Sequence, residues 1–294
     1  MERFGSVELG GTKILVALGT PEGELGPAER IETGGDPVAA CARVVDSLRS
    51  EKISAIGISA FGPLDLEIGS DTFGSLLDTP KPGWSGFDVL ESIAGPLGVP
   101  AAIDTDVGGA ALGEGRWGAS QGLRHHAYVT VGTGIGAGVV EAGELIHGSA
   151  HPEIGHVAVR RINGDDFPGA CPFHADCLEG MASGNAVKAR YGESIDALAG
   201  EAQAAAVELI AGYIAQGIRA LVYSVAPQRV VVGGGVSKSP GFHDKVRASL
   251  QVELAGYGTR DHHRSSGFVV PPGLGDRSGL FGGLELAARA LARH

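Results

Sequence analysis

The chain has 294 residues, a formal net charge of −11 and 43% hydrophobic residues, which is enough apolar material for one large or two ordinary globular domains. An acidic chain repels phosphate backbones, so we expect no nucleic-acid partner. Three cysteines are too few for a disulfide framework. Because no signal peptide or membrane-spanning stretch is evident, we expect a cytoplasmic protein with no membrane partner.

The first half of the chain alternates strand and helix patterns. It opens on two β-rich runs joined by a Gly-Gly bend, which predicts a β-hairpin. The later strand-like run "PAAIDTD" ends in carboxylates. The expected ranges are strands at 4–9 and 14–18, a helix at 37–50 that opens on Pro37, strands at 53–60 and 100–106, and a helix starting near 108.

The second half repeats this pattern. Residues 126–146 resemble residues 6–25, since each has a β-rich run, a Gly/Thr bend and a second β-rich run. A duplicated hairpin-plus-α/β unit is the most economical interpretation, with a boundary near 113–120. A long alanine-rich helix at 199–226, a strand within 229–242 and a final helix at 278–294 complete an α/β architecture.

Three glycine loops punctuate these elements: "ELGGTK" at 8–13, "VGTGIGAG" at 131–138 and "VVVGGGVS" at 230–237. None is a dinucleotide fingerprint or a Walker loop, because the required spacing or strand–helix context is missing. Two facing hairpins with Thr12 and Thr133 at their bends would hold a polyphosphate, and the third loop would take a nucleoside. This arrangement resembles the hexokinase/actin-type ATPase fold.

Two carboxylates, Asp104 and Asp106, flank Thr105 at a predicted strand end. Most such residues are turn residues or helix caps. Phosphoryl transfer, however, needs a carboxylate that takes the proton of the acceptor hydroxyl. Asp106 is our candidate for this base.

Soft metal ligands gather in residues 151–180. Cys171, His174 and Cys177 form C-x2-H-x2-C, and His156 lies upstream. Four N and S ligands suit a closed tetrahedral structural zinc site, against the alternative of ordinary buried cysteines. We expect His151 to be a solvated histidine and the third cysteine, Cys41, to be a core residue. Two carboxylates bracket the ligands and would accept hydrogen bonds from a polyhydroxyl compound: Glu153 and Glu179.

The motifs "ELGGTK", "DTDVxxAALGE", "VTVGTGIGAGVV", "HPEIGHVxVRR…CPFHADCLEGxASG", "VVVGGGVS" and "LGDRSGLFGG" together resemble the ROK family of sugar kinases and repressors. The nearest branch is the bacterial fructokinases. The resemblance implies a two-lobed, duplicated ribonuclease H-like (actin-like ATPase) fold. One lobe would comprise 1–115 with a returning helix at about 280–294, and the other 116–279. It also implies a homodimer that phosphorylates fructose to fructose 6-phosphate, with glucose or mannose as alternative substrates.

The resemblance also implies roles for individual residues. Asp106 would be the base, and His156 would contact both sugar and Zn²⁺. Glu8 would lie near the Mg²⁺ that accompanies ATP. The remaining sugar contacts would be Thr105, Glu153, Glu179 and Gly62. The ATP contacts would be Gly10, Gly11, Thr12, Lys13, Gly132, Thr133, Gly134, Gly233, Gly234 and Gly235.

The chain departs from the family pattern at three places. Gly108 and Asn185 replace a common Asn and a common Pro, and the zinc element lacks the three cysteines of many glucokinases.

Two other functions compete with a sugar kinase. A sugar-responsive repressor would carry an N-terminal helix-turn-helix, whereas here the first glycine hairpin begins within ten residues of Met1. A zinc hydrolase needs an open coordination position, which four protein ligands do not leave.

Overall fold

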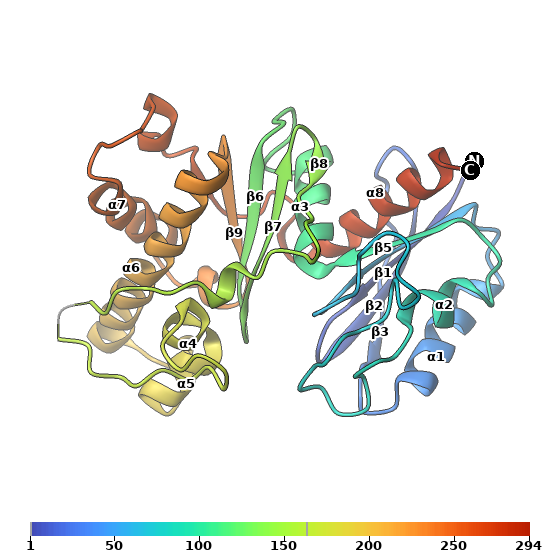
Figure 1. The fold of residues 1–294 in the computed structure, drawn as a ribbon, viewed down its shortest axis with the longest axis horizontal. Helices are drawn as coiled ribbons and strands as arrows, with labels where there is room; N and C mark the ends of the chain where they lie inside the picture. The colour runs from blue at the N-terminus through green and yellow to red at the C-terminus, as the bar shows by residue number, and fades with distance from the viewer. Residues whose placement is uncertain (1, 163) are drawn as a thin grey trace. The chain divides into compact units, whose positions relative to one another are not determined.

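The fold is taken from a computed structural model that describes residues 2–162 and 164–294 (Figure 1). The described chain forms two compact units. Unit 1 comprises residues up to Gly122, Leu145–Pro152 and Asp276–His294, and unit 2 comprises Leu123–Glu144 and Glu153–Gly275. The lobe boundaries expected from the sequence stay a prediction.

Each unit contains one sheet, and the described strands are β1 (Phe4–Leu9), β2 (Lys13–Gly19), β3 (Glu29–Glu32), β4 (Ala55–Ala60), β5 (Ala101–Thr105), β6 (His126–Val131), β7 (Ile135–Glu141), β8 (Glu144–Leu145), β9 (Arg229–Gly233) and β10 (Val269–Val270). The helices are α1 (Pro37–Arg49), α2 (Val89–Ala94), α3 (Asp106–Trp117), α4 (Leu178–Ala182), α5 (Gly184–Tyr191), α6 (Gly200–Val225), α7 (Phe242–Leu254) and α8 (Ser278–Ala292). A short 3-10 turn, η1, covers Ile154–His156.

The two sheets have the same topology. The first has the order β3-β2-β1-β4-β5 and the second β10-β9-β6-β7-β8, which is the same arrangement in reverse. In each, an antiparallel hairpin supplies two strands, β1–β2 or β6–β7, and its first strand pairs in parallel with a later one, β4 or β9. The duplicated unit predicted from the sequence is therefore confirmed.

Unit 1 has helices on both faces of its sheet. Alternate residues of β1 point to opposite faces, so Val7 and Leu9 enter an apolar core with Cys41 of α1. On the other face, Ser6 donates a hydrogen bond to Leu280 O of α8 (2.5 Å). A Cβ at Gly57 of β4 would lie 1.9 Å from Gly283 O, so glycine is required for this close approach of α8.

The described residues of unit 2 include the helices α4, α5, α6 and α7, of which α6 is the longest (Figure 1). Its 26 residues include an 18-residue window with mean hydropathy 1.4, of which 67% is buried inside the protein. The expectation that no stretch is long enough to span a membrane is therefore wrong, since α6 has the necessary length and composition. The burial indicates a core helix that contacts α4 and α7.

Several elements differ from the sequence expectations. The strand expected at 100–106 ends at Thr105, because the Thr105 side chain accepts a hydrogen bond from Gly108 N and caps α3. Asp106 is therefore the first residue of a helix. The expected helix at 37–50 and the final helix are observed within two residues of their predicted bounds. The sequence did not predict β3, α2, α4, α5, α7 or β10.

Candidate functional site

The first glycine turn connects β1 to β2 in unit 1. Gly10 N donates to Lys13 O (2.9 Å), which closes the turn, and Thr33 Oγ donates to Gly10 O (2.7 Å). Gly11 and Thr12 are exposed, and a Cβ at Gly11 would meet no atom within 4 Å. The turn therefore leaves room for a ligand against its backbone.

Three carboxyl groups of unit 1 lie near one another around β1 and α3. Glu8 is on the β1 face that packs on α8, where a Cβ at Gly279 would lie 2.5 Å from Glu8 Oε2. Burial raises the pKa of Glu8 to about 7, and the charges of Asp106 and Asp276 add to this effect. Asp106 Oδ1 accepts a hydrogen bond from Val107 N (2.8 Å).

The environment of Glu8 fits a divalent cation. Its Oε2 atom is buried and has no hydrogen-bond partner among the described residues. A buried carboxylate without a donor is costly, whereas a cation satisfies it and favours its charged form. Oxygen ligands are those that Mg²⁺ prefers. Glu8 is therefore suited to hold Mg²⁺, directly or through water.

The second glycine turn connects β6 to β7 in unit 2. Gly132 N donates to Gly134 O (2.9 Å). The start of α5 lies against this turn, since Gly184 N donates to Gly132 O (2.7 Å) and Asn185 N donates to Thr133 O (3.2 Å). Thr133 itself is exposed. A side chain at 134 has no room, because a Cβ there would lie 2.5 Å from Glu179 Oε2.

Glu179 is held on this turn, since its Oε2 atom accepts a hydrogen bond from Ile135 N (2.9 Å). Glu179 lies in α4, directly after the metal-ligand segment. It thereby connects that segment to the second glycine turn. Glu153, by contrast, is exposed at the residue before η1.

The third glycine loop follows β9. Gly233 ends the strand, Gly234 has φ +89°, and a Cβ at Gly234 would lie 2.5 Å from the Val131 backbone, so both conformation and space require glycine there. Gly235 is exposed. A shallow, open depression of about 480 Å³ lies beyond the loop, lined by residues 237–244 and Pro271.

The predicted metal ligands come together. His156 Nδ1 lies 3.7 Å from Cys171 Sγ, 3.6 Å from Cys177 Sγ and 3.4 Å from His174 Nδ1. All four ligand atoms lie within 4.8 Å of one another. Tetrahedral zinc with ordinary bond lengths separates two nitrogens by roughly 3.4 Å and nitrogen from sulfur by roughly 3.6 Å. The cluster is able to hold a structural zinc ion.

Two properties of the ligands bear on how a metal would bind here. Burial raises the pKa of the Cys177 thiol to about 11, so the thiolate that coordinates zinc would form only as the ion binds. The Nδ1 atom of His156 faces the other ligands, which leaves Nε2 as the ring atom for a second partner. His151 is not part of the cluster.

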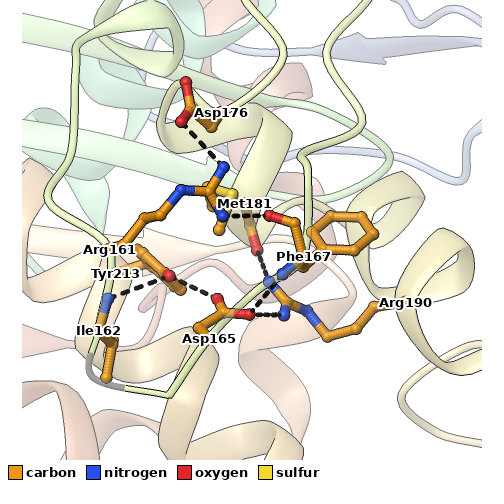
Figure 2. Close-up of polar contacts among 8 residues, drawn as sticks. All are labelled: Arg161, Ile162, Asp165, Phe167, Asp176, Met181, Arg190 and Tyr213. Atoms are coloured by element: carbon orange, nitrogen blue, oxygen red, sulfur yellow. Dashed lines mark hydrogen bonds and ion pairs between the residues drawn. The ribbon is translucent and has the colours of Figure 1, made fainter.

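A buried polar network holds the segment between the metal ligands (Figure 2). Arg190 of α5 forms an ion pair with Asp165, and the two side chains are 9% and 5% exposed. Tyr213 of α6 donates to the same carboxylate. Burial alone would raise the pKa of Asp165, but hydrogen bonds from Arg190 and Tyr213 outweigh it and lower that pKa.

A second part of this network lies closer to the cysteines. Arg161 donates to Phe167 O and forms an ion pair with Asp176 (3.0 Å), and the Arg190 guanidinium lies over the Phe167 ring (Figure 2). The segment therefore has a polar framework in addition to the metal ligands.

Two histidines of unit 1 have partners that the sequence did not predict. His147 Nε2 lies 2.7 Å from Asp104 Oδ2, and this hydrogen bond raises the pKa of His147. His151 is 9% exposed and its Nε2 atom accepts a hydrogen bond from Leu64 N (3.1 Å). The expectation that His151 is solvated is wrong, since its ring also packs against Gly62, where a Cβ would lie 3.4 Å away. No sequence spacing indicated either contact.

Comparison with known proteins identifies the family of the chain. The model of the ROK family matches residues 4–290. A fructokinase of Zymomonas mobilis is 38% identical over 295 residues, covering 98% of this chain and 97% of that protein. A fructokinase of Pediococcus pentosaceus is 36% identical over 288 residues, covering 98% of each chain.

Solved structures are similar along the whole chain. A ROK hexokinase from Thermus thermophilus has a TM-score of 0.79 and 25% identity, covering 99% of this chain and 100% of that one. A ROK glucokinase from Streptomyces griseus, in complex with glucose and AMPPNP, has a TM-score of 0.78 and 25% identity, covering 98% and 99%. The prediction of an actin-like ATPase fold is confirmed, and the chain belongs to the ROK family.

Proposed function

We propose that this protein is an ATP-dependent hexose kinase that transfers the γ-phosphoryl group of ATP to D-fructose and forms fructose 6-phosphate. The observation that carries the proposal is the identity of 36–38% to fructokinases over nearly the full chain. Glucose and mannose are the competing acceptors, and glucose has support because glucokinases are also relatives, at 27–30% identity.

The nucleotide would be bound mainly by backbone groups. The first and second glycine turns (Gly10–Lys13 and Gly132–Gly134) would contact the phosphates with N–H groups and with the Thr12 and Thr133 hydroxyls. Gly233–Gly235 would contact the nucleoside. The open depression lined by 237–244 follows directly on this loop, and the purine base would lie there.

Asp106 would act as the general base. As the first residue of α3 it follows the cap at Thr105, and its carboxylate would accept the proton of the sugar hydroxyl as that oxygen attacks the γ-phosphorus. Glu8 would hold Mg²⁺, which neutralises charge on the phosphates when bound. The positive charge of Lys13 lowers the pKa of Glu8 and so partly offsets the effect of burial.

The sugar would be held by hydroxyl-directed acceptors and donors. Glu153, Glu179 and the Nε2 atom of His156 would bond to its hydroxyls from unit 2, with Thr105 and Gly62 contributing from unit 1. A zinc ion on His156 Nδ1 would fix the orientation of that ring. Since the proposed residues come from both units, variants in either unit test the proposal.

A hexose panel tests the function. Purified protein is incubated with ATP, Mg²⁺ and fructose, glucose or mannose, and ADP release and the sugar phosphate are measured. We expect the highest kcat/KM for fructose, with fructose 6-phosphate as product. No ADP release above background with any of these sugars would reject the proposal. Hydrolytic activity that persists without ATP but disappears when zinc is removed would instead indicate a zinc hydrolase.

We also propose that the protein works as a cytoplasmic homodimer. The support is the family membership alone. Light scattering of the purified protein measures the mass, and a mass equal to one chain of 29.8 kDa would contradict the dimer.

A further inference from the structure

A short segment, Leu145–Pro152, belongs to unit 1 although the chain on either side of it belongs to unit 2. Two of its side chains bond to unit 1. His151 accepts a hydrogen bond from Leu64 N, and His147 bonds to Asp104 of β5. In the second contact, Asp104 precedes Asp106 by two positions in the sequence.

Asp104 is a buried carboxylate whose two oxygens have different partners. The residue is 6% exposed, so each oxygen needs a donor. Oδ2 is 2.7 Å from His147 Nε2. Oδ1 accepts from Thr105 N (2.7 Å) and lies 3.3 Å from Thr105 Oγ. The His147 contact thereby sets the rotation of the carboxylate that holds Thr105.

Thr105 transmits this arrangement to α3. Its Oγ atom accepts from Gly108 N (3.0 Å) and caps the helix whose first residue is Asp106. Gly108 also makes room for the carboxylate, because a Cβ there would lie 2.3 Å from Asp104 Oδ1.

We propose that His147 is a positioning residue, which orients Asp104 and through it Thr105 and the start of α3, so that the Asp106 carboxylate is aimed at the acceptor hydroxyl. The inference rests on the proposed kinase function. His147 contacts neither Asp106 nor Thr105 directly, so its effect passes through Asp104. Without the Nε2 donor, Asp104 Oδ2 loses this partner. The Asp104 carboxylate can then rotate, and the Thr105 cap of α3 is weakened.

The test compares three substitutions at one position. In His147→Gln the side-chain amide nitrogen corresponds to Nε2 and keeps the donor, while His147→Asn is too short and His147→Ala has none. We expect His147→Ala and His147→Asn to lower kcat/KM for fructose on the order of 100-fold, the effect of a misplaced catalytic group. The fall should lie mainly in kcat, with KM for ATP unchanged. His147→Gln should restore most of the loss.

Controls separate this role from general stability and from the kinase proposal. His151→Ala removes a different contact of the same segment, the hydrogen bond with Leu64 N, and we expect a clearly smaller fall in kcat than for His147→Ala. Equal falls in the two variants, or a His147→Gln variant as impaired as His147→Asn, would overturn the positioning role. If His147→Ala does not fold, the Gln and Asn variants give the same contrast. Absence of hexose kinase activity in the unmodified protein would refute the proposed function itself, whereas full activity in His147→Asn refutes only this inference.

Discussion

The two sheets share one topology but carry different chemistry at equivalent positions. Glu8 precedes the last residue of β1, and Thr130 has the same position in β6, as the hairpin registers show. A carboxylate beside a phosphate needs a cation, whereas a threonine hydroxyl can donate to the phosphate directly. In this duplicated scaffold the proposed Mg²⁺ and proton chemistry would therefore belong to unit 1 alone, whereas a glycine turn that could contact phosphate occurs in each unit.

The units also differ in how they hold their site residues. In unit 1 the proposed residues lie at the ends of strands packed on an apolar core that includes Trp84. In unit 2 the described residues between Glu153 and Cys177 lie outside the sheet, where the Asp165–Arg190 ion pair holds them and the residues able to bind zinc gather. Loss of a polar side chain should therefore lower the free energy of unfolding more in unit 2 than in unit 1.

The largest expected effect follows from breaking the buried ion pair. Arg190→Ala leaves Asp165 as a buried charge without its ionic partner, which should lower the free energy of unfolding by about 3–5 kcal/mol. Urea unfolding measures it. The matched control in unit 1 is Arg3→Ala. Arg3 forms an ion pair with Glu51, and the two side chains are 55% and 33% exposed, so its loss should lower the free energy of unfolding by less than about 1 kcal/mol. Similar losses in both variants would contradict the contrast.

Loss of a metal ligand should weaken sugar binding. We expect Cys171→Ser to abolish zinc retention and to weaken fructose affinity on the order of 10–100-fold, with less effect on nucleotide affinity. Metal analysis and calorimetric titration with fructose check this. Cys41→Ala is the control, because Cys41 is buried in the core of unit 1. Unchanged fructose affinity in Cys171→Ser would exclude the orienting role of the metal.

Acid should also weaken the Asp165–Arg190 ion pair, with a smaller loss of stability than Arg190→Ala causes. Because the pKa of Asp165 is lowered in the folded protein, its contribution to stability is present above the unfolded pKa of about 3.9 and is lost as the pH falls through the folded pKa. Asp165→Asn removes this titration. Urea unfolding at pH 7 and near pH 3.5 should show a larger acid-induced loss in the unmodified protein than in the variant, and equal losses would contradict the assignment.

The smallest expected effects concern helix caps, and here the two units should behave alike. Asp36 caps α1 in unit 1 and Ser183 caps α5 in unit 2, each accepting a backbone hydrogen bond. Replacing either with Ala should cost about 1 kcal/mol of unfolding free energy. A much larger loss for Ser183→Ala would mean that the contact of α5 with the second glycine turn depends on this cap.

Local patterns in the sequence predicted the features that local chemistry determines. The glycine bends marked both hairpins, and the spacing of Cys171, His174 and Cys177 marked the metal cluster. Short elements escaped prediction, since β3 (Glu29–Glu32) is charged and mostly exposed and forms a strand only by pairing with β2.

Contacts between distant residues escaped prediction for a different reason. His147 and Asp104 are 43 positions apart, and Arg190 and Asp165 are 25 apart, so only the folded chain brings these pairs together. Asp106 was expected at a strand end, but the Thr105 cap makes it the first residue of a helix. Charge and spacing identify candidate groups, whereas tertiary packing decides their partners.

The most direct test of the division of chemistry between the units is Asp106→Asn. We expect kcat for fructose to fall on the order of 1,000-fold, because the general base is lost, while the affinity for a non-hydrolysable ATP analogue stays within about twofold. Asp71→Asn, an exposed aspartate of the same unit, serves as the control. An Asp106→Asn enzyme that retains the kcat of the unmodified protein would contradict the account.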